Sequence, residues 1–204
     1  MIDACFEPDS NDTGAFSERD RAVLRVIGEE KLLSFTFEGL RRRTGTHSET
    51  LSRIINRLEK GDILARTDGG YVVTERGREI SMPYHSVAGE PGTTILQTVL
   101  PPVRDTRLVV SGLMGRWFGN LRWFGHSAAN GTTILKWVTG DGRVQLDAVF
   151  DGLRLTIKGR AGAGADTSEA IEASHRLVGY ISKLYAARHG RSSDYIPPGP
   201  TGEN

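Results

Sequence analysis

The chain has 204 residues and carries 26 Lys and Arg against 25 Asp and Glu, which gives a formal net charge of +1 at pH 7. This length suits one or two domains with a real hydrophobic core. The nearly neutral charge does not mark the whole chain as a binder of polyanions. The single cysteine, Cys5, excludes an intrachain disulfide framework and a cysteine-based zinc site.

Targeting and cofactor signals are also missing from the sequence. No apolar run reaches about 18 residues, and no signal-peptide pattern is present. The five histidines are scattered, without a close pair at metal-ligand spacing. We therefore expect a cytoplasmic protein with no membrane partner, no metal and no other cofactor.

The first part of the chain divides into a tail and a domain. Residues 1–16 carry four acids and no Lys or Arg, and we expect them to form a disordered acidic tail. Residues 17–80 carry 13 basic and 11 acidic side chains and are expected to form the first domain. Ser17 is a suitable cap for its first helix. Three apolar residues of that helix share the side facing the core: Val23, Leu24 and Ile27.

A second helix, a tight turn at Thr44-Gly45 and a third helix follow. Four apolar residues of the third helix fall at i, i+3, i+4 and i+7 and are expected to face the core: Leu51, Ile54, Ile55 and Leu58. Thr46 and Glu49 fit a capping box at its start, and His47 is the alternative first capping position. Gly61 is expected to end the helix in the left-handed conformation.

The opposite face of the third helix is polar and holds most of the functional information. Glu49, Ser52, Arg53, Asn56 and Lys60 point away from the apolar stripe, and Arg57 lies on its edge. Arginine pairs with guanine, asparagine with adenine, and serine with several base edges. The alternative is that this face is merely the solvated side of an amphipathic helix.

The elements around the third helix favour a DNA-reading module. Arg41, Arg42 and Arg43 close the second helix beside the turn, where phosphates would pass. A short hairpin is expected from Ile63 to Val73, with its turn at residues 68–70. Arg66 stands on this hairpin, where a wing touches the DNA backbone or minor groove.

The order of these motifs resembles the winged helix-turn-helix domains of prokaryotic transcription regulators of the MarR and ArsR type, over residues from about 17 to 80. The matching segments are Thr44-Gly45, Ser52-Arg53, Leu58-Glu59-Lys60-Gly61-Asp62-Ile63 and Thr74-Glu75-Arg76-Gly77. Two departures are Glu49 on the reading face and Asp68 at the hairpin tip, since both would repel phosphate. The expected DNA contacts are Arg41, Arg42, Arg43, Thr46, His47, Ser48, Ser52, Arg53, Asn56, Arg57 and Arg66.

Residues 81–92 are rich in Pro, Gly and small residues and are expected to form a linker. Residues 93–190 then show three turn signals, at 130–131, 139–142 and 151–152, which predict an antiparallel meander with one dry face. Ile95, Val99, Val109 and Val110 suggest one or two further strands before it. The expected facing pairs are Phe124 with Trp137, Thr139 with Gly142, Trp137 with Val144, Leu135 with Leu146, Phe150 with Leu153, Ala148 with Leu155 and Leu146 with Ile157.

A long helix is expected to cover the dry face. Asp166 and Glu169 can cap a helix that runs to about His189, and residues 191–204 then form a disordered tail. Its apolar stripe consists of Ile171, Ser174, Leu177, Val178, Ile181, Leu184 and Tyr185. The expected fold is therefore α+β: a winged helix-turn-helix domain, then an antiparallel β-meander covered by a long C-terminal helix. Part of the stripe can instead pair with a second copy in a dimer.

The segment 115–125, GRWFGNLRWFG, supplies two of the three tryptophans. Trp117, Phe118, Trp123 and Phe124 are candidates for the wall of an effector pocket. The alternative is that they belong to the core or to a dimer interface, with glycines allowing curvature. An uninterrupted strand would leave aromatics on both faces, so one pair is expected to be available to a partner.

We expect no catalysis. The glycine-rich segment 159–166 lacks the Gly-Lys-Ser/Thr ending of a P-loop and the spacing of a dinucleotide fingerprint. Two functions remain. The first is a sequence-specific regulator that binds double-stranded DNA as a homodimer, with a second domain that dimerises or senses a small-molecule effector. The second is a protein-interaction or scaffold module without specific DNA readout.

Overall fold

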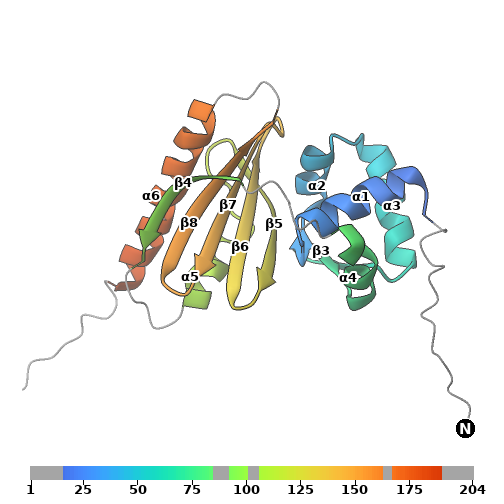
Figure 1. The fold of residues 1–204 in the computed structure, drawn as a ribbon, viewed down its shortest axis with the longest axis horizontal. Coiled ribbons are helices and arrows are strands. Elements are labelled where there is room, and N and C mark those ends of the chain that lie inside the picture. Colours follow the sequence, from blue (N-terminus) through green and yellow to red (C-terminus); the bar gives the residue numbers. More distant parts are fainter. Residues whose placement is uncertain (1–15, 85–91, 101–105, 163–166, 190–204) are drawn as a thin grey trace, which may run out of the picture. The chain divides into compact units, whose positions relative to one another are not determined.

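The computed structural model describes residues 16–84, 92–100, 106–162 and 167–189 (Figure 1). The chain has a mixed α+β fold and divides into two compact units. The first comprises residues 1–91 with 125–127, and the second comprises residues 92–124 with 128–204. Cys5, Asp166 and most of the two predicted tails lie outside the described residues.

The described residues of the first unit form four α-helices, a short 3-10 helix and three short strands. In chain order its elements are α1 (Glu18–Glu29), β1 (Ser34–Phe35), α2 (Phe37–Thr44), α3 (Ser48–Lys60), β2 (Leu64–Thr67), β3 (Gly70–Val73), α4 (Glu75–Ser81) and η2 (Met82–Tyr84). The strands lie in the order β2-β3-β1, and each neighbouring pair is antiparallel. The predicted hairpin is therefore present, and its turn lies between Thr67 and Gly70.

The predicted cap of α1 is confirmed. The Ser17 hydroxyl accepts from the Asp20 N–H at 3.2 Å, and the Asp20 carboxylate accepts from the Ser17 N–H at 3.0 Å. The apolar stripes of α1 and α3 are buried to 1% exposure or less, as their spacing predicted.

The start of α3 follows the alternative at His47, and its end differs from the prediction. His47 is the N-cap and makes no side-chain capping bond, so the Thr46–Glu49 capping box is wrong. At the other end Gly61 has a φ of −84°, and Asp62 takes the left-handed conformation with a φ of 55°. The reason is a Schellman motif, in which Ile63 N–H donates to Leu58 O and Asp62 N–H donates to Glu59 O. This ending buries Ile63 at 1% exposure.

Helix α4 was not predicted, although the sequence contains a capping residue and a glycine that are typical of such a helix. The Thr74 side chain caps it by accepting from the Gly77 N–H at 3.0 Å. A Cβ at Gly77 would lie 2.2 Å from the Ile63 carbonyl oxygen, so only glycine fits there. The Thr-x-x-Gly motif therefore has a local physical cause, namely a helix cap followed by close packing.

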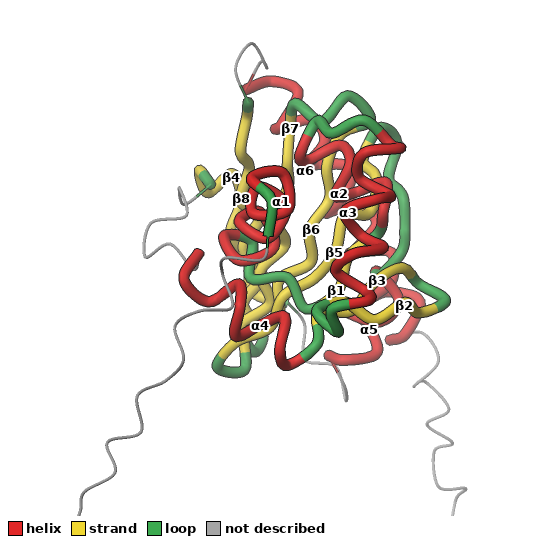
Figure 2. Tube along the Cα trace, turned by 90° about the vertical axis from the view of Figure 1, so that its right-hand side faces the viewer, coloured by secondary structure: helices red, strands yellow, loops and turns green. Residues whose placement is uncertain are grey.

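In the part that the structure describes, the second unit forms five antiparallel strands and two helices. Its elements are β4 (Thr93–Val99), α5 (Thr106–Leu113), β5 (Leu121–Ala129), β6 (Thr132–Thr139), β7 (Val144–Asp151), β8 (Arg154–Ala161) and α6 (Thr167–His189). The strand order is β5-β6-β7-β8-β4. Helix α6 contacts β4, β7 and β8 and runs along the sheet in Figure 1, and Figure 2 shows β5, β6 and β7 as strands of that sheet.

The predicted dry face is present, but both strand pairings, β6 with β7 and β7 with β8, are shifted by two residues. Trp137 lies opposite Leu146 instead of Val144, and Leu135 lies opposite Ala148 instead of Leu146. Phe150 lies opposite Leu155 instead of Leu153, Ala148 opposite Ile157 instead of Leu155, and Leu146 opposite Gly159 instead of Ile157. A shift of two keeps every side chain on its face. The core holds most of the residues predicted for that face, namely Leu135, Trp137, Val144, Leu146, Ala148, Phe150, Leu155 and Ile157, but it does not include Phe124 or Leu153.

The shift between β6 and β7 arises in the turn. The Thr139 hydroxyl donates to Asp141 Oδ1 at 2.6 Å and accepts from the Val144 N–H at 3.0 Å, so it closes a longer loop. Hydrogen bonds from the Thr139 hydroxyl and from Arg143 lower the pKa of Asp141 to about 2. These side-chain hydrogen bonds stabilise the longer loop over the tighter turn that Gly140 and Gly142 suggested.

Two further expectations for the second unit need correction. Val109 and Val110 lie on helix α5, so within the described part of the second unit β4 is the one strand that precedes β5. Ile171 is 42% exposed and does not belong to the buried stripe of α6. The rest of that stripe packs as predicted, with Ser174, Leu177, Ile181 and Tyr185 at 3% exposure or less.

Candidate nucleic-acid interface

Helices α2 and α3 are joined by a short, well-defined turn. The Thr36 side chain caps α2 by accepting from the Gly39 N–H at 3.1 Å. Gly45 ends α2 in the left-handed conformation with a φ of 63°, which non-glycine residues rarely adopt. The Thr44 hydroxyl donates to the Leu40 carbonyl at 2.9 Å, and it accepts from the Thr46 N–H at 3.3 Å. The turn is therefore fixed by its own side chains.

Helix α3 presents the polar face that the sequence predicted. Its buried side is fully packed, and the opposite side is exposed to solvent. The exposed residues are His47, Ser48, Glu49, Ser52, Arg53, Asn56, Arg57 and Lys60. Thr46 is half-buried. Because these side chains are presented by a rigid helix, their positions relative to one another are fixed.

The three predicted base readers, Ser52, Arg53 and Asn56, differ in whether they have a polar partner. Within the described part of the chain, Ser52 and Asn56 make no hydrogen bond, so their polar groups face solvent. Arg53 is 72% exposed, but its Nη2 atom lies 2.5 Å from Glu49 Oε1. This exposed i,i+4 pair is worth only about 0.3–0.5 kcal/mol. Arg53 can therefore exchange Glu49 for another acceptor at low cost.

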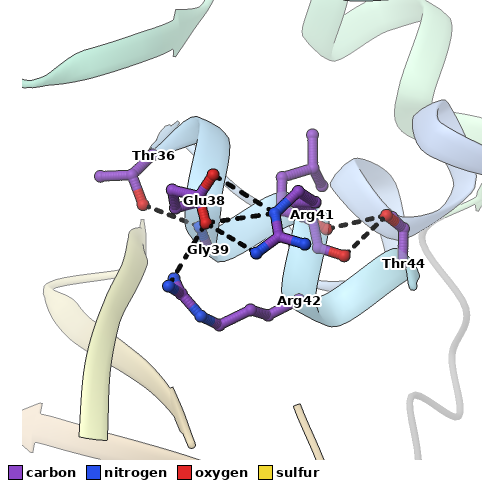
Figure 3. A network of polar contacts seen from close by, with 7 residues as sticks. Thr36, Glu38, Gly39, Arg41, Arg42 and Thr44 are labelled. Carbon is purple, nitrogen blue, oxygen red and sulfur yellow. Dashed lines mark hydrogen bonds and ion pairs between the residues drawn. The ribbon is translucent and has the colours of Figure 1, made fainter. Parts of the chain in front are cut away.

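Two of the three arginines at the end of α2, Arg41 and Arg42, turn back onto their own helix (Figure 3). Arg41 and Arg42 both reach Glu38, with nitrogen-to-oxygen distances of 3.0 and 3.3 Å. Arg43 pairs with Glu30, whose side chain is only 1% exposed. The cluster therefore carries less free positive charge than three consecutive arginines suggest, and Arg43 has a structural partner.

Arg57 also has a structural partner. Its Nη2 lies 2.5 Å from Oδ1 of Asp20, whose side chain is 5% exposed. Asp20 belongs to α1, so this ion pair joins the start of α1 to α3. Sequence reasoning missed Asp20, although the Ser17-x-x-Asp20 spacing of a capping box could have drawn attention to it.

The hairpin carries Arg66 on its exposed side. Its side chain is 65% exposed, and it lies over the Tyr71 ring with the guanidinium carbon 5.5 Å from the centroid. It also donates to Glu59 at 3.3 Å and to the Tyr71 hydroxyl at 3.1 Å. The hairpin therefore offers one oriented cation beside the C-terminal part of α3.

Three of the four candidate effector residues are buried by the fold. Phe118, Trp123 and Phe124 are 6% exposed or less, so the expectation that one aromatic pair is available to a partner is wrong. Gly119 has a φ of 58° and lies between Phe118 and the start of β5 at Leu121. The four aromatic residues therefore do not lie on one uninterrupted strand and do not alternate between its two faces. Only Trp117 is exposed, at 65%, and the Arg122 guanidinium carbon lies 4.6 Å from its ring centroid.

Neither metal ligation nor membrane insertion finds support in the described ranges. No group of three or more His, Cys, Asp or Glu side chains in them could hold a metal ion. None of the helices there combines the length and apolar character needed to cross a membrane. Comparison with protein-family models, curated proteins and solved structures gave no match.

Proposed function

We propose that the first unit is a winged helix-turn-helix module and that the protein is a sequence-specific regulator that binds double-stranded DNA. The exposed polar face of α3 carries this proposal. That face follows a tight helix–turn–helix and precedes a short hairpin, in the order that winged-helix modules use. The major groove, about 12 Å wide, admits one α-helix, and α3 has the required length and exposure.

In this proposal the side chains have separate tasks. Arg53 and Asn56 read bases, since arginine pairs bidentately with guanine and asparagine with adenine. Ser48 and Ser52 lie on the same face and donate to base edges or phosphates. Arg41, Arg42 and Arg66 meet the DNA backbone. Arg57 instead keeps α3 in place through Asp20.

The test is binding to labelled genomic fragments across a salt series, measured by electrophoretic retention and fluorescence anisotropy. Arg53→Ala is expected to weaken binding to the preferred fragment by about 1–3 kcal/mol and to relax its sequence preference. Arg42→Ala and Arg66→Ala are expected to weaken binding to all fragments alike, and to reduce the salt slope by about 1.

The matched control is Arg78→Ala, because Arg78 is exposed on α4 and lies outside the α3 face and the hairpin. It removes the same charge and should leave the sequence preference unchanged. If the Arg53→Ala and Asn56→Ala variants bind every fragment as the wild type does, α3 is not the reading helix.

A protein-interaction module without specific DNA readout is the second candidate. One observation favours it: every arginine of the predicted interface has a carboxylate partner in its own unit. A basic DNA surface usually leaves such charges available to phosphate. If the wild-type protein binds none of the fragments at about 50 mM salt, this result supports the second candidate.

For the second unit we propose a role in joining two copies or in sensing a ligand. Two-fold pairing would place two recognition helices on two half-sites of the DNA. Of the four aromatic residues considered for an effector, only Trp117 is exposed enough to contact one directly. An effector that binds there should change tryptophan fluorescence in the wild type but not in Trp117→Phe.

A further inference from the structure

Strand β4 forms an edge of the sheet of the second unit. It pairs with β8 on one side, and no strand among the described residues pairs with its other side (Figure 1). Every residue of β4 is at least partly exposed. An edge of this kind offers unpaired backbone donors and acceptors to another strand.

The usual protections of an edge strand are missing from the second half of β4. Charged side chains, prolines and bulges normally block such edges. Residues 92–100 contain no charged residue and no proline. One irregularity is present between Thr94 and Leu96, and it affects only the first half of the strand. From Leu96 onward the pairing with β8 is regular.

The open backbone groups can be assigned. The Leu100 N–H donates to the Leu153 carbonyl at 2.7 Å, so Leu100 points toward β8. Successive residues of a strand direct their backbone groups to alternate sides. The N–H and C=O groups of Val99 and Gln97 therefore point to the open edge.

One strongly exposed apolar side chain lies on the open segment, because Val99 is 73% exposed. Its neighbour Leu100 lies opposite Leu153, so Val99 points to the other face of the sheet from these two leucines. A strand that pairs with β4 would cover part of Val99 and would gain the hydrophobic contribution of its burial.

We propose that β4 is the site at which two copies of this chain associate, by antiparallel pairing of β4 with β4. A two-fold axis near Thr98 places Gln97 of one copy opposite Val99 of the other, and the reverse. The open segment is uncharged, so a second copy meets no like charge along it. This self-complementarity selects a second copy as the occupant. One short strand pair forms a small interface, so the dimer should be weak and concentration-dependent.

The proposal concerns the second unit and is independent of DNA binding. The mass of the full chain is measured without DNA by light scattering and by sedimentation equilibrium, from about 5 to 500 µM. The wild type should rise from the 22.3 kDa of one chain toward twice that value. The amides of Gln97 and Val99 should exchange more slowly with solvent at the higher concentrations.

Two variants target the edge without removing a hydrogen bond to β8. Val99→Lys places a charge at the exposed end, and Gln97→Pro removes one outward N–H. Both should remain at the mass of one chain over the whole range. Leu108→Lys is the matched control, because Leu108 is an exposed apolar residue on α5, outside β4. It should dimerise as the wild type does.

Circular dichroism melting checks that each variant is folded, and Val99→Lys decides the result if Gln97→Pro is not. A wild type that keeps the mass of one chain at every concentration overturns the proposal. Val99→Lys protein that dimerises as strongly as the wild type also overturns the proposal, because the interface must then lie elsewhere. Neither result affects the DNA-binding proposal, which the Arg53 and Asn56 variants test separately.

Discussion

Asp20 is the residue that most clearly connects local sequence with tertiary packing. Its carboxylate caps α1 through Ser17 and accepts from Arg57 of α3. Burial alone would raise the pKa of Asp20, but the hydrogen bonds from Arg57 and Ser17 outweigh this effect and lower it. One carboxylate therefore fixes both the start of α1 and the place of α3.

Replacing Arg57 by Ala should destabilise the first unit by about 1–3 kcal/mol, because it leaves the buried Asp20 carboxylate with an unsatisfied oxygen. Urea unfolding followed by circular dichroism measures the loss. Arg53→Ala is the control, since it removes only an exposed pair and should cost at most about 0.5 kcal/mol. Equal losses in the two variants would contradict a structural role for Arg57.

The same variant has a defined pH dependence. The pKa of Asp20 is lower in the folded state than its ordinary value of about 3.9. Its contribution is therefore complete above about pH 4 and is lost as the pH falls through the lowered pKa. The difference in stability between wild type and Arg57→Ala should be constant from about pH 7 to pH 5 and should shrink below about pH 4.

At the scale of the element, the sequence predicted the helices and strands that have a clear hydrophobic period or turn signal. It missed those whose structure depends on contacts with other parts of the chain. The apolar spacing found α1, α3 and α6, and the turn signals found the strands from β5 to β8. Helices α4 and α5 have seven and eight residues, too short for a clear period. The β-branched pair Val109-Val110 suggested a strand, yet it lies on α5, because packing overrides local preference.

Two ion pairs of the candidate interface, Arg57–Asp20 and Arg43–Glu30, were missed for a related reason. Arg57 and Asp20 are 37 positions apart in the chain, and Arg43 and Glu30 are 13 apart. No local rule connects residues at such separations. The exposed face of α3 needed only the helical period, so Ser52, Arg53 and Asn56 could be placed from the sequence. The pairing of their neighbours required the fold.

The close packing of α4 against the hairpin can be tested by a substitution at Gly77. A Cβ there would lie 2.2 Å from the Ile63 carbonyl oxygen and 2.9 Å from a methyl carbon of Val73. Gly77→Ala should therefore destabilise the first unit by more than about 2 kcal/mol, since backbone would have to move. Gly69→Ala is the control, because nothing lies within 4 Å of its added methyl group. Thermal melting that shows equal stability for both variants would rule out this close packing.

At the scale of the whole molecule, charge limits how DNA can be bound. The net charge is +1, and each predicted interface arginine is shared with an acid. Counterion release by a single copy should therefore be small, and affinity should depend weakly on salt. Two linked copies double the number of phosphate contacts and raise affinity through effective concentration. The two proposals thus support each other without depending on each other.

Their combination makes one last prediction, on a duplex that contains two half-sites of the preferred sequence. Wild-type protein should bind it more tightly than a duplex with one half-site, and its slope of log affinity against log salt should be about twice as steep. Val99→Lys should bind both duplexes with the affinity and the slope of a single copy. Fluorescence anisotropy at several salt concentrations measures all four cases. Identical slopes for the wild type and Val99→Lys on the two-site duplex would mean that β4 pairing does not operate on DNA, because each chain would then bind by itself.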